Sequence, residues 1–152
     1  MKVGIGNDHA AVNFKNQLKS YMESKGIEVV DYGSQDPSAK DDYPDFALAV
    51  AEALVKGELD RGVLICGTGV GISIAANKVP GIRAGVCSDT ATARLIVQHN
   101  NANIIALGER IVGIELAKDI LDAFFAASFE GGRHAERIKK VTAIEEKYSG
   151  RA

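Results

Sequence analysis

The chain has 152 residues, of which 46% are hydrophobic and 25% are charged, with a formal net charge of -2. These values are typical of one globular domain, predicted over residues 1–152, and the small net charge argues against a nucleic-acid-binding protein. No apolar run is as long as a membrane span and the N-terminus lacks the apolar stretch of a signal peptide, so we expect a cytoplasmic protein with no membrane contact.

Strand-like and helix-like segments alternate along the chain, beginning with a strand over residues 2–6. The helix that follows is predicted to be capped by Asn7 or Asp8 and ended by Gly26. The other predicted strands cover residues 27–31, 63–65, 82–87 and 102–107. The other predicted helices cover residues 43–55, 72–76, 89–98, 113–125 and 135–147. This alternation predicts an α/β fold: a three-layer, Rossmann-like, doubly wound sheet of five parallel strands with an extra C-terminal helix.

Ligands of such sheets bind beyond the carboxyl ends of the strands, where the strand order reverses. Several polar residues directly follow predicted strands and are expected to share this edge. They are Asp8 and His9, Cys66 to Thr68, and Arg110. His99 and Asn100 instead precede the last strand, at the end of a helix. We therefore expect them to reach a site from its flank, with a partner subunit's site as one option.

The stretch from Arg61 to Lys78 is the most informative part of the sequence. A buried strand runs into Cys66, a glycine-rich turn follows, and a helix then begins. Three alternate glycines let the backbone approach a ligand, and amides at a helix start attract anions. A helix N-terminus also favours a thiolate, so we assign Cys66 a functional role and leave Cys87, which has no such turn, to the core.

Two nucleotide-binding motifs compete with this interpretation. A dinucleotide fingerprint needs a third glycine where the chain has Ile72, and the glycines near the N-terminus fail in the same way at His9. Asp31 nevertheless ends the second strand where a ribose-binding acid would stand. A Walker loop lacks its Gly-Lys-Ser/Thr. A small anion hole of backbone amides, able to stabilise a developing oxyanion, is the better interpretation.

The start of the last predicted helix carries Arg133 and Arg137, four residues apart and therefore on one helical face. Paired arginines suit bidentate phosphate recognition, although a solvated charged face is the ordinary alternative. The same helix has an apolar stripe at Ile138, Val141 and Ile144, which could pack on another subunit. The three histidines have no metal-ligand spacing with the cysteines, so no metal is predicted.

Six segments together resemble the type B ribose-5-phosphate isomerases, a family that includes galactose-6-phosphate isomerase subunits. They are residues 6–10, 42–45, 64–78, 81–84, 99–103 and 130–134. The resemblance covers essentially the whole chain. It implies an aldose–ketose isomerase that works through an enediolate with no metal or organic cofactor, in homodimers or tetramers whose active sites are shared between subunits.

The resemblance also implies roles for individual residues. Cys66 matches the base that moves a proton between carbons 2 and 1, and His99 matches the residue that assists ring opening. Thr68 and the backbone amides of the turn match the groups that hold the enediolate oxygens. These amides belong to Gly67, Gly69, Val70 and Gly71. The matches to substrate and phosphate contacts are Asp8, His9, Asn100, Arg110, Arg133 and Arg137.

The chain departs from the family pattern at several positions near the expected site, including Ala11 and the segment from Ala91 to Asn101. These departures remove no catalytic group, but they leave the sugar open. A six-carbon substrate, such as allose or galactose 6-phosphate, is the first alternative to ribose 5-phosphate. A non-catalytic sugar-phosphate or nucleotide-binding module is the second, and a nicotinamide-dependent oxidoreductase is a distant third.

Overall fold

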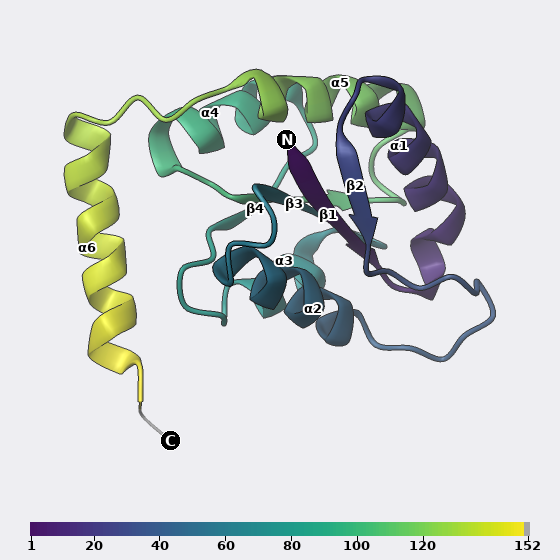
Figure 1. Cartoon of the computed structure of the whole chain (residues 1–152), viewed down its shortest axis with the longest axis horizontal. Helices are drawn as coiled ribbons and strands as arrows, with labels where there is room; N and C mark the ends of the chain where they lie inside the picture. Colours follow the sequence, from purple (N-terminus) through teal and green to yellow (C-terminus); the bar gives the residue numbers. More distant parts are fainter. Residues whose placement is uncertain (151–152) are drawn as a thin grey trace.

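A computed structural model describes residues 1–150 and confirms the alternation of strands and helices (Figure 1). The strands are β1 (Lys2–Asn7), β2 (Glu28–Asp31), β3 (Arg61–Cys66), β4 (Ala84–Val86) and β5 (Ile104–Gly108). The helices are α1 (Val12–Ser24), α2 (Tyr43–Val55), α3 (Val70–Ala76), α4 (Thr90–Asn100), α5 (Ile114–Ala126) and α6 (Arg133–Tyr148), with a 3₁₀ turn η1 (His9–Ala11) before α1. Residues 151–152, the end of the predicted domain, lie outside the described part. Among residues 1–150, no helix has the length and apolar character that crossing a membrane requires.

All five strands are parallel, in the order β2-β1-β3-β5-β4. The chain passes from β1 to β2 on one side and then crosses to β3 on the other, so the order reverses between β1 and β3. In the ladders, Asn7 pairs with Ile65 and Cys66 pairs with Gly108. The carboxyl ends of β1, β3 and β5 therefore lie side by side at the position where such sheets bind ligands.

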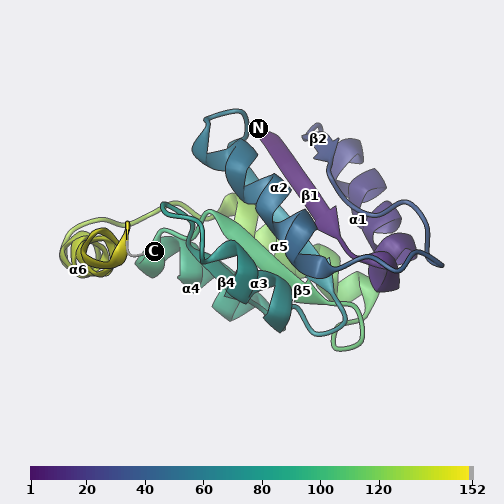
Figure 2. The same ribbon diagram turned by 90° about the horizontal axis from the view of Figure 1, so that it is seen from below.

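Helices cover both faces of the sheet, which confirms the three-layer, doubly wound prediction (Figures 1 and 2). Successive strand residues point to opposite faces, so β3 places Val63 and Ile65 in one core and Leu64 and Cys66 in the other. The first core is completed by α1, α4 and α5, and the second by α2 and α3. Cys66 is therefore packed under the helix that follows its own turn.

The extra C-terminal helix α6 stands apart from these layers, at the end of a connecting segment that follows α5 (Figures 1 and 2). It contacts α4, and the carboxylate of Glu145 accepts hydrogen bonds from the Gly81 amide at 3.0 and 3.1 Å. Its apolar stripe is open to solvent, with Val141 52% and Ile144 62% exposed. An apolar stripe of this kind gains free energy when another surface covers it.

The fourth strand is shorter than the predicted range 82–87 because its first residues are held in a turn. The Ile82 amide donates to the Val79 carbonyl, and the Arg83 amide donates to the Asn103 side chain. Other boundaries shift by a residue or two, and α6 begins at Arg133 rather than at Ala135. Gly26 follows the last turn of α1 at φ 81°, as the sequence predicted.

One buried ion pair joins α1 to the end of β2. Lys15 is fully buried, and its Nζ lies 2.7 Å from Asp31 Oδ2. Burial opposes the charged form of Asp31, but the hydrogen bonds from Lys15 and from the Gly33 amide outweigh it and lower the pKa of this carboxyl. The carboxylate that a dinucleotide-binding fold would use for ribose is thus already paired, which counts against that alternative.

Candidate active site

Cys66 ends β3 with its side chain almost closed off from solvent, at 5% exposure. Its sulfur accepts a hydrogen bond from the Gly69 amide, with a nitrogen–sulfur distance of 3.2 Å. A hydrogen-bond donor directed at a sulfur stabilises the thiolate relative to the thiol, and the thiolate is the form that acts as a base. The turn therefore supplies a hydrogen-bond donor to this sulfur from within three residues.

The glycine turn is shaped by close contact with the end of β5. Gly69 has φ 79°, and a Cβ there would lie 2.9 Å from the Leu107 carbonyl carbon. A Cβ on Gly108 would lie 2.6 Å from the Thr68 carbonyl oxygen. Only glycine fits at both places, so the sequence of the turn is set by backbone packing as well as by chemistry.

The turn amides do not all remain available for a ligand. The Gly69 amide is used by Cys66, and the Val70 amide donates to the Thr68 hydroxyl at 3.3 Å. The amide of Gly71 belongs to the first turn of α3, where helices leave backbone donors without an intrahelical partner. The Thr68 side chain itself is exposed at the mouth of the turn. Fewer backbone amides of this turn are therefore available to bind an anion than the sequence implied, because those of Gly69 and Val70 already have partners.

Two side chains from other elements cover the turn. Arg110, from the loop after β5, lies over Gly67, where an added Cβ would be 3.5 Å from the guanidinium carbon. The Arg110 amide also donates to the Gly67 carbonyl at 3.0 Å. The Tyr43 ring lies over Gly71, where a Cβ would come within 2.8 Å. Tyr43 belongs to the segment 42–45 that resembles the family, but its contact with this turn was not predicted. The sequence alone does not show that α2 faces the turn.

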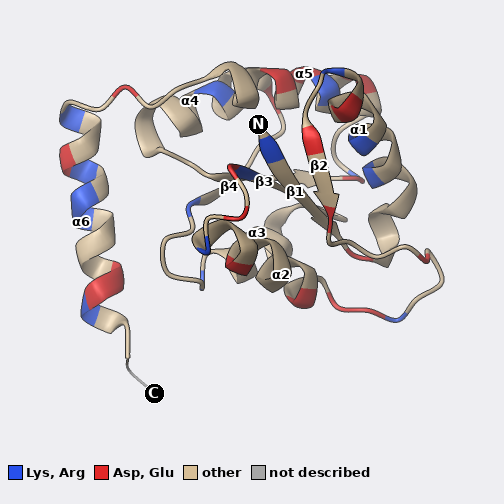
Figure 3. Cartoon of the chain, viewed as in Figure 1, with Lys and Arg blue, Asp and Glu red and all other residues tan. Residues whose placement is uncertain are grey.

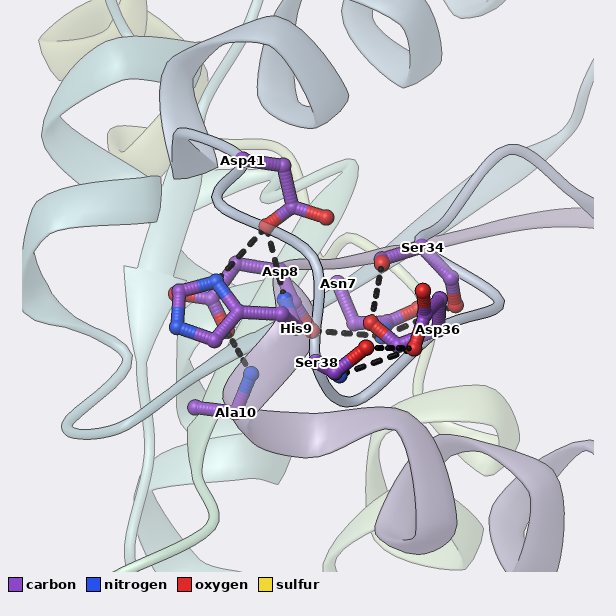
Figure 4. Close-up of polar contacts among 8 residues, drawn as sticks. All are labelled: Asn7, Asp8, His9, Ala10, Ser34, Asp36, Ser38 and Asp41. Carbon is purple, nitrogen blue, oxygen red and sulfur yellow. Dashed lines mark hydrogen bonds and ion pairs between the residues drawn. The ribbon is translucent and has the colours of Figure 1, made fainter.

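Asp8 and His9 follow β1 at the same edge (Figure 4). The Asp8 carboxylate caps η1, because its Oδ1 accepts a hydrogen bond from the Ala10 amide at 3.1 Å. The amide of His9 and its Nδ1 both donate to Asp41 Oδ1, at 2.9 and 2.8 Å. The hydrogen bond that His9 donates to Asp41 raises the pKa of His9 against a smaller opposing effect of burial. Sequence reasoning missed Asp41, which lies 32 residues away in a loop.

The second cysteine serves as an internal contrast. Cys87 is 2% exposed, and burial, helped by the nearby Asp89 charge, raises its pKa to about 12. Its thiol therefore stays protonated at any physiological pH. This environment confirms the assignment of Cys87 to the core.

His99 and Asn100 lie at the opposite edge of the sheet. Helix α4 begins beyond the carboxyl end of β4 and runs back across the sheet, so its last residues precede the amino end of β5. The register of β3 and β5 puts four residues between the two edges, about 13 Å of strand. One chain therefore does not bring His99 to Cys66, whereas the sequence leaves open whether His99 serves its own site or a neighbouring subunit's.

At this amino edge His99 stacks on His134, with ring centroids 4.2 Å apart and planes 9° from parallel. Glu130 Oε2 lies 3.9 Å from Nε2 of His99 and 3.6 Å from Nε2 of His134. The Glu130 amide donates to the Gln98 carbonyl, which ties the segment before α6 to the end of α4. His134 directly follows Arg133 in the sequence, but nothing in the sequence indicates that it contacts His99.

The two α6 arginines, Arg133 and Arg137, complete a positively charged group at this edge. Burial lowers the pKa of His134 first, and the positive charges of His99, Arg133 and Arg137 lower it further, against the attraction of Glu130. The lowered pKa favours the neutral form of His134, beside the two exposed arginines. This is an arrangement that favours an anion.

His99, Glu130 and His134 also place three ligand atoms within 4.8 Å of one another, as a metal site would need. The stacked rings argue against such a site, because the in-plane lone pairs of nearly parallel imidazoles run side by side rather than converge on one ion. The absence of a metal stays a prediction. The face-to-face packing instead favours a role for His99 that does not involve metal coordination.

Comparison with known proteins places this geometry in a family. Residues 3–141 match the family model described as Ribose/Galactose Isomerase. The chain is 50% identical over 146 residues to ribose-5-phosphate isomerase B of Escherichia coli, covering 96% of this chain and 97% of the relative.

Two solved structures agree with that match. A Clostridium thermocellum ribose-5-phosphate isomerase B superimposes with a TM-score of 0.96 at 56% identity, over 98% of this chain and 100% of the other. The Mycoplasma genitalium ribose-5-phosphate isomerase B, crystallised with bound ribulose-5-phosphate, superimposes with a TM-score of 0.90 at 41% identity, over 96% and 97% of the two chains. Together with the strand order and the position of Cys66 at the end of β3, these similarities show that the chain belongs to the ribose/galactose isomerase family.

Proposed function

We propose that the protein interconverts D-ribose 5-phosphate and D-ribulose 5-phosphate through an enediolate, with Cys66 as the base and His99 assisting ring opening. The observation that carries the proposal is the position of Cys66. This residue ends a buried strand, and its sulfur accepts a hydrogen bond from the Gly69 amide at 3.2 Å. The family membership of the chain supports the same reaction.

The chemistry asks little beyond acid–base groups. A thiolate removes the proton on carbon 2 of the open sugar and returns it to carbon 1, while a hydroxyl proton moves between oxygens 2 and 1. No electrons enter or leave, so the proposed reaction needs no organic cofactor. In this proposal the Thr68 hydroxyl and the Gly71 amide hold the enediolate oxygens, which would lower the energy of the charged intermediate.

The complete site requires two chains, and we propose a homodimer, with a tetramer as the alternative assembly. Cys66 and His99 lie at opposite edges of one sheet, so His99 would act on the site of a neighbouring subunit. Asn100, Arg133 and Arg137 would enter with it. The exposed stripe of Val141 and Ile144 supports this assembly, since it lines an open groove between α6 and residues 77–84 that an apolar surface of another subunit could fill.

The phosphate would then be held from both sides. His9 and Arg110 come from the chain that supplies Cys66, while the two α6 arginines come from the partner. Binding energy gained at the phosphate, remote from the reacting carbons, orients the sugar for proton transfer.

The sugar itself has a second candidate. The family description names galactose as well as ribose, so a six-carbon sugar phosphate is the alternative substrate. A cytoplasmic location, expected from composition, also stays a proposal.

A coupled assay across ribose 5-phosphate, allose 6-phosphate and galactose 6-phosphate, with Cys66→Ser as the control, tests the reaction. We expect ribose 5-phosphate to have the highest kcat/KM and the Cys66→Ser variant to be inactive. Dominance of a hexose phosphate would replace the substrate but keep the mechanism. Failure to exchange solvent deuterium into any of the sugars would leave only a binding module.

A further inference from the structure

The loop between β2 and α2, residues 32–42, brings Asp41 to His9 (Figure 4). Asp41 Oδ1 accepts hydrogen bonds from both the amide and the ring Nδ1 of His9, at 2.9 and 2.8 Å. The Asp41 side chain is 21% exposed and the His9 side chain 40% exposed. Two bonds to one residue fix the start of η1 and the rotation of the imidazole together.

The loop holds its shape through contacts that do not involve His9. Ser34 is buried, and its amide donates to the Asn7 carbonyl at 2.9 Å. The Asn7 Nδ2 donates to the Asp8 carbonyl at 2.8 Å and to the Ser34 carbonyl at 3.4 Å. Farther along, Asp36 Oδ1 accepts the Ser38 amide and hydroxyl at 2.8 and 2.7 Å. The position of Asp41 is therefore set by the loop, and His9 is oriented by it.

The contact also sets the chemical state of the ring. With Nδ1 donating to Asp41, the second ring nitrogen, Nε2, faces away from the carboxylate (Figure 4). The groups that act on the imidazole are Asp41 from the loop and Asp8 from the end of β1, and both raise the pKa of His9 while burial lowers it. A protonated His9 can then donate Nδ1–H to Asp41 and Nε2–H to an anionic oxygen.

Asp41 is itself held in the charged form that this role requires. Burial opposes its ionisation, but hydrogen bonds from Ser34 and from the amide and ring of His9 outweigh that effect and lower its pKa. Both partners are thus stabilised as ions by one short contact.

We infer that Asp41 is a positioning residue, which holds His9 as a charged donor whose Nε2–H binds the substrate phosphate. This inference rests on the proposed function, because the ligand it assigns to His9 is the phosphate of the sugar phosphate. Asp41 acts only through His9.

The chain offers a matched pair of variants. Asp41→Asn keeps an oxygen acceptor of the same size but removes the charge. Asp36→Asn makes the same change in the same loop, at a residue that bonds Ser38 instead of His9. Because the chain has only three histidines, the His9 ring signal in a proton NMR titration can be assigned with a His9→Gln variant.

We expect the titration midpoint of His9 to fall in Asp41→Asn and to stay unchanged in Asp36→Asn. The KM for ribose 5-phosphate should rise about fivefold in Asp41→Asn at neutral pH, the difference between a charge-assisted and a neutral hydrogen bond, with kcat retained. The ratio of the two KM values should approach one at lower pH, where His9 is charged in both proteins, and should be largest between their two midpoints.

Three results would overturn the inference: equal His9 midpoints in the two proteins, a KM ratio that does not change with pH, or the same KM increase in Asp36→Asn. The dissociation constant of inorganic phosphate, measured by calorimetry, separates this inference from the proposed function. If wild-type protein fails to isomerise ribose 5-phosphate, the proposed function is wrong. The inference then survives only if Asp41→Asn still weakens phosphate binding.

Discussion

The two edges of the sheet carry different kinds of functional group and hold them in different ways. At the carboxyl edge, Cys66 is packed into the core and its sulfur accepts a hydrogen bond from the Gly69 amide of its own turn. At the amino edge, His99 lies half-buried at the end of α4, and the exposed arginines lie on α6, which stands clear of the sheet. We infer that a working site combines the carboxyl edge of one subunit with the amino edge of another, because each edge carries only part of the proposed catalytic and binding groups.

Figure 3 shows a related difference in charge. Blue and red segments alternate along α6, while the apolar central strands carry little charge. In the proposed site, the exposed Arg133 and Arg137 of α6 would attract the phosphate, whereas the reacting carbons would meet the largely buried Cys66. The expected effects below follow this division, from the largest to the smallest.

The largest effect is expected at the base. Cys66→Ala should lower kcat by about a thousandfold, because general-base catalysis is lost while the phosphate contacts remain. Cys87→Ala is the matched control, since it deletes a buried thiol that stays protonated. A Cys66→Ala enzyme with wild-type kcat in the coupled assay would show that the base has been assigned to the wrong residue.

The second largest effect is expected on the stability of the fold. Lys15→Met should lower the free energy of unfolding by about 3 kcal/mol, because it leaves Asp31 partly buried without its main partner. The pKa of Asp31 is lowered from 3.8, so the pair stabilises the fold above that pH and is lost as pH falls below it. Urea unfolding at several pH values measures this: the difference between the proteins should be constant from about pH 5 to 8 and shrink below about pH 4.

Lys139 provides the contrast on α6, where its side chain is 72% exposed. Lys139→Met should leave the free energy of unfolding nearly unchanged. If it destabilised the fold as much as Lys15→Met, α6 would be part of the core, contrary to its position in this structure.

The third effect tests the stripe on α6. Ile144→Glu should weaken self-association by about 2 kcal/mol, because a carboxylate would be buried in an apolar contact. Analytical ultracentrifugation over a dilution series measures the change, and Lys139→Glu introduces the same side chain away from the stripe. A dimer that survives Ile144→Glu unchanged would mean that another surface joins the subunits.

The smallest effect is expected at the phosphate. Arg137→Ala should raise KM by about tenfold with little change in kcat, since one of several charged hydrogen bonds to the phosphate is lost. Steady-state kinetics with ribose 5-phosphate, with Lys139→Ala as the control, provides the measurement. An unchanged KM would remove Arg137 from the phosphate site.

The sequence predicted one edge of the sheet better than the other. The Cys66 turn was visible because strand, turn and helix start are contiguous, and the strand alternation gave the fold. The burial of Lys15 was not predicted, although its spacing from the apolar positions Val12 and Leu18 could have placed it inward.

The missed contacts are those between residues far apart in the chain. Asp41 meets His9 across a polar loop without regular structure, where periodicity carries no information. The stacking of His134 on His99 depends on how the segment before α6 turns, which Gly131 and Gly132 permit but do not specify. Residues that come from another subunit leave still less of a signal in one sequence.

The shared site can be tested most directly by complementation between two inactive variants. Cys66→Ala and His99→Asn are produced separately and then coexpressed in equal amounts. If each site takes Cys66 from one subunit and His99 from its partner, random pairing should restore about a quarter of wild-type activity, because half of the dimers carry one intact site of two. Activity no higher than that of the separate variants would mean that Cys66 and His99 serve the same subunit, which would contradict this account.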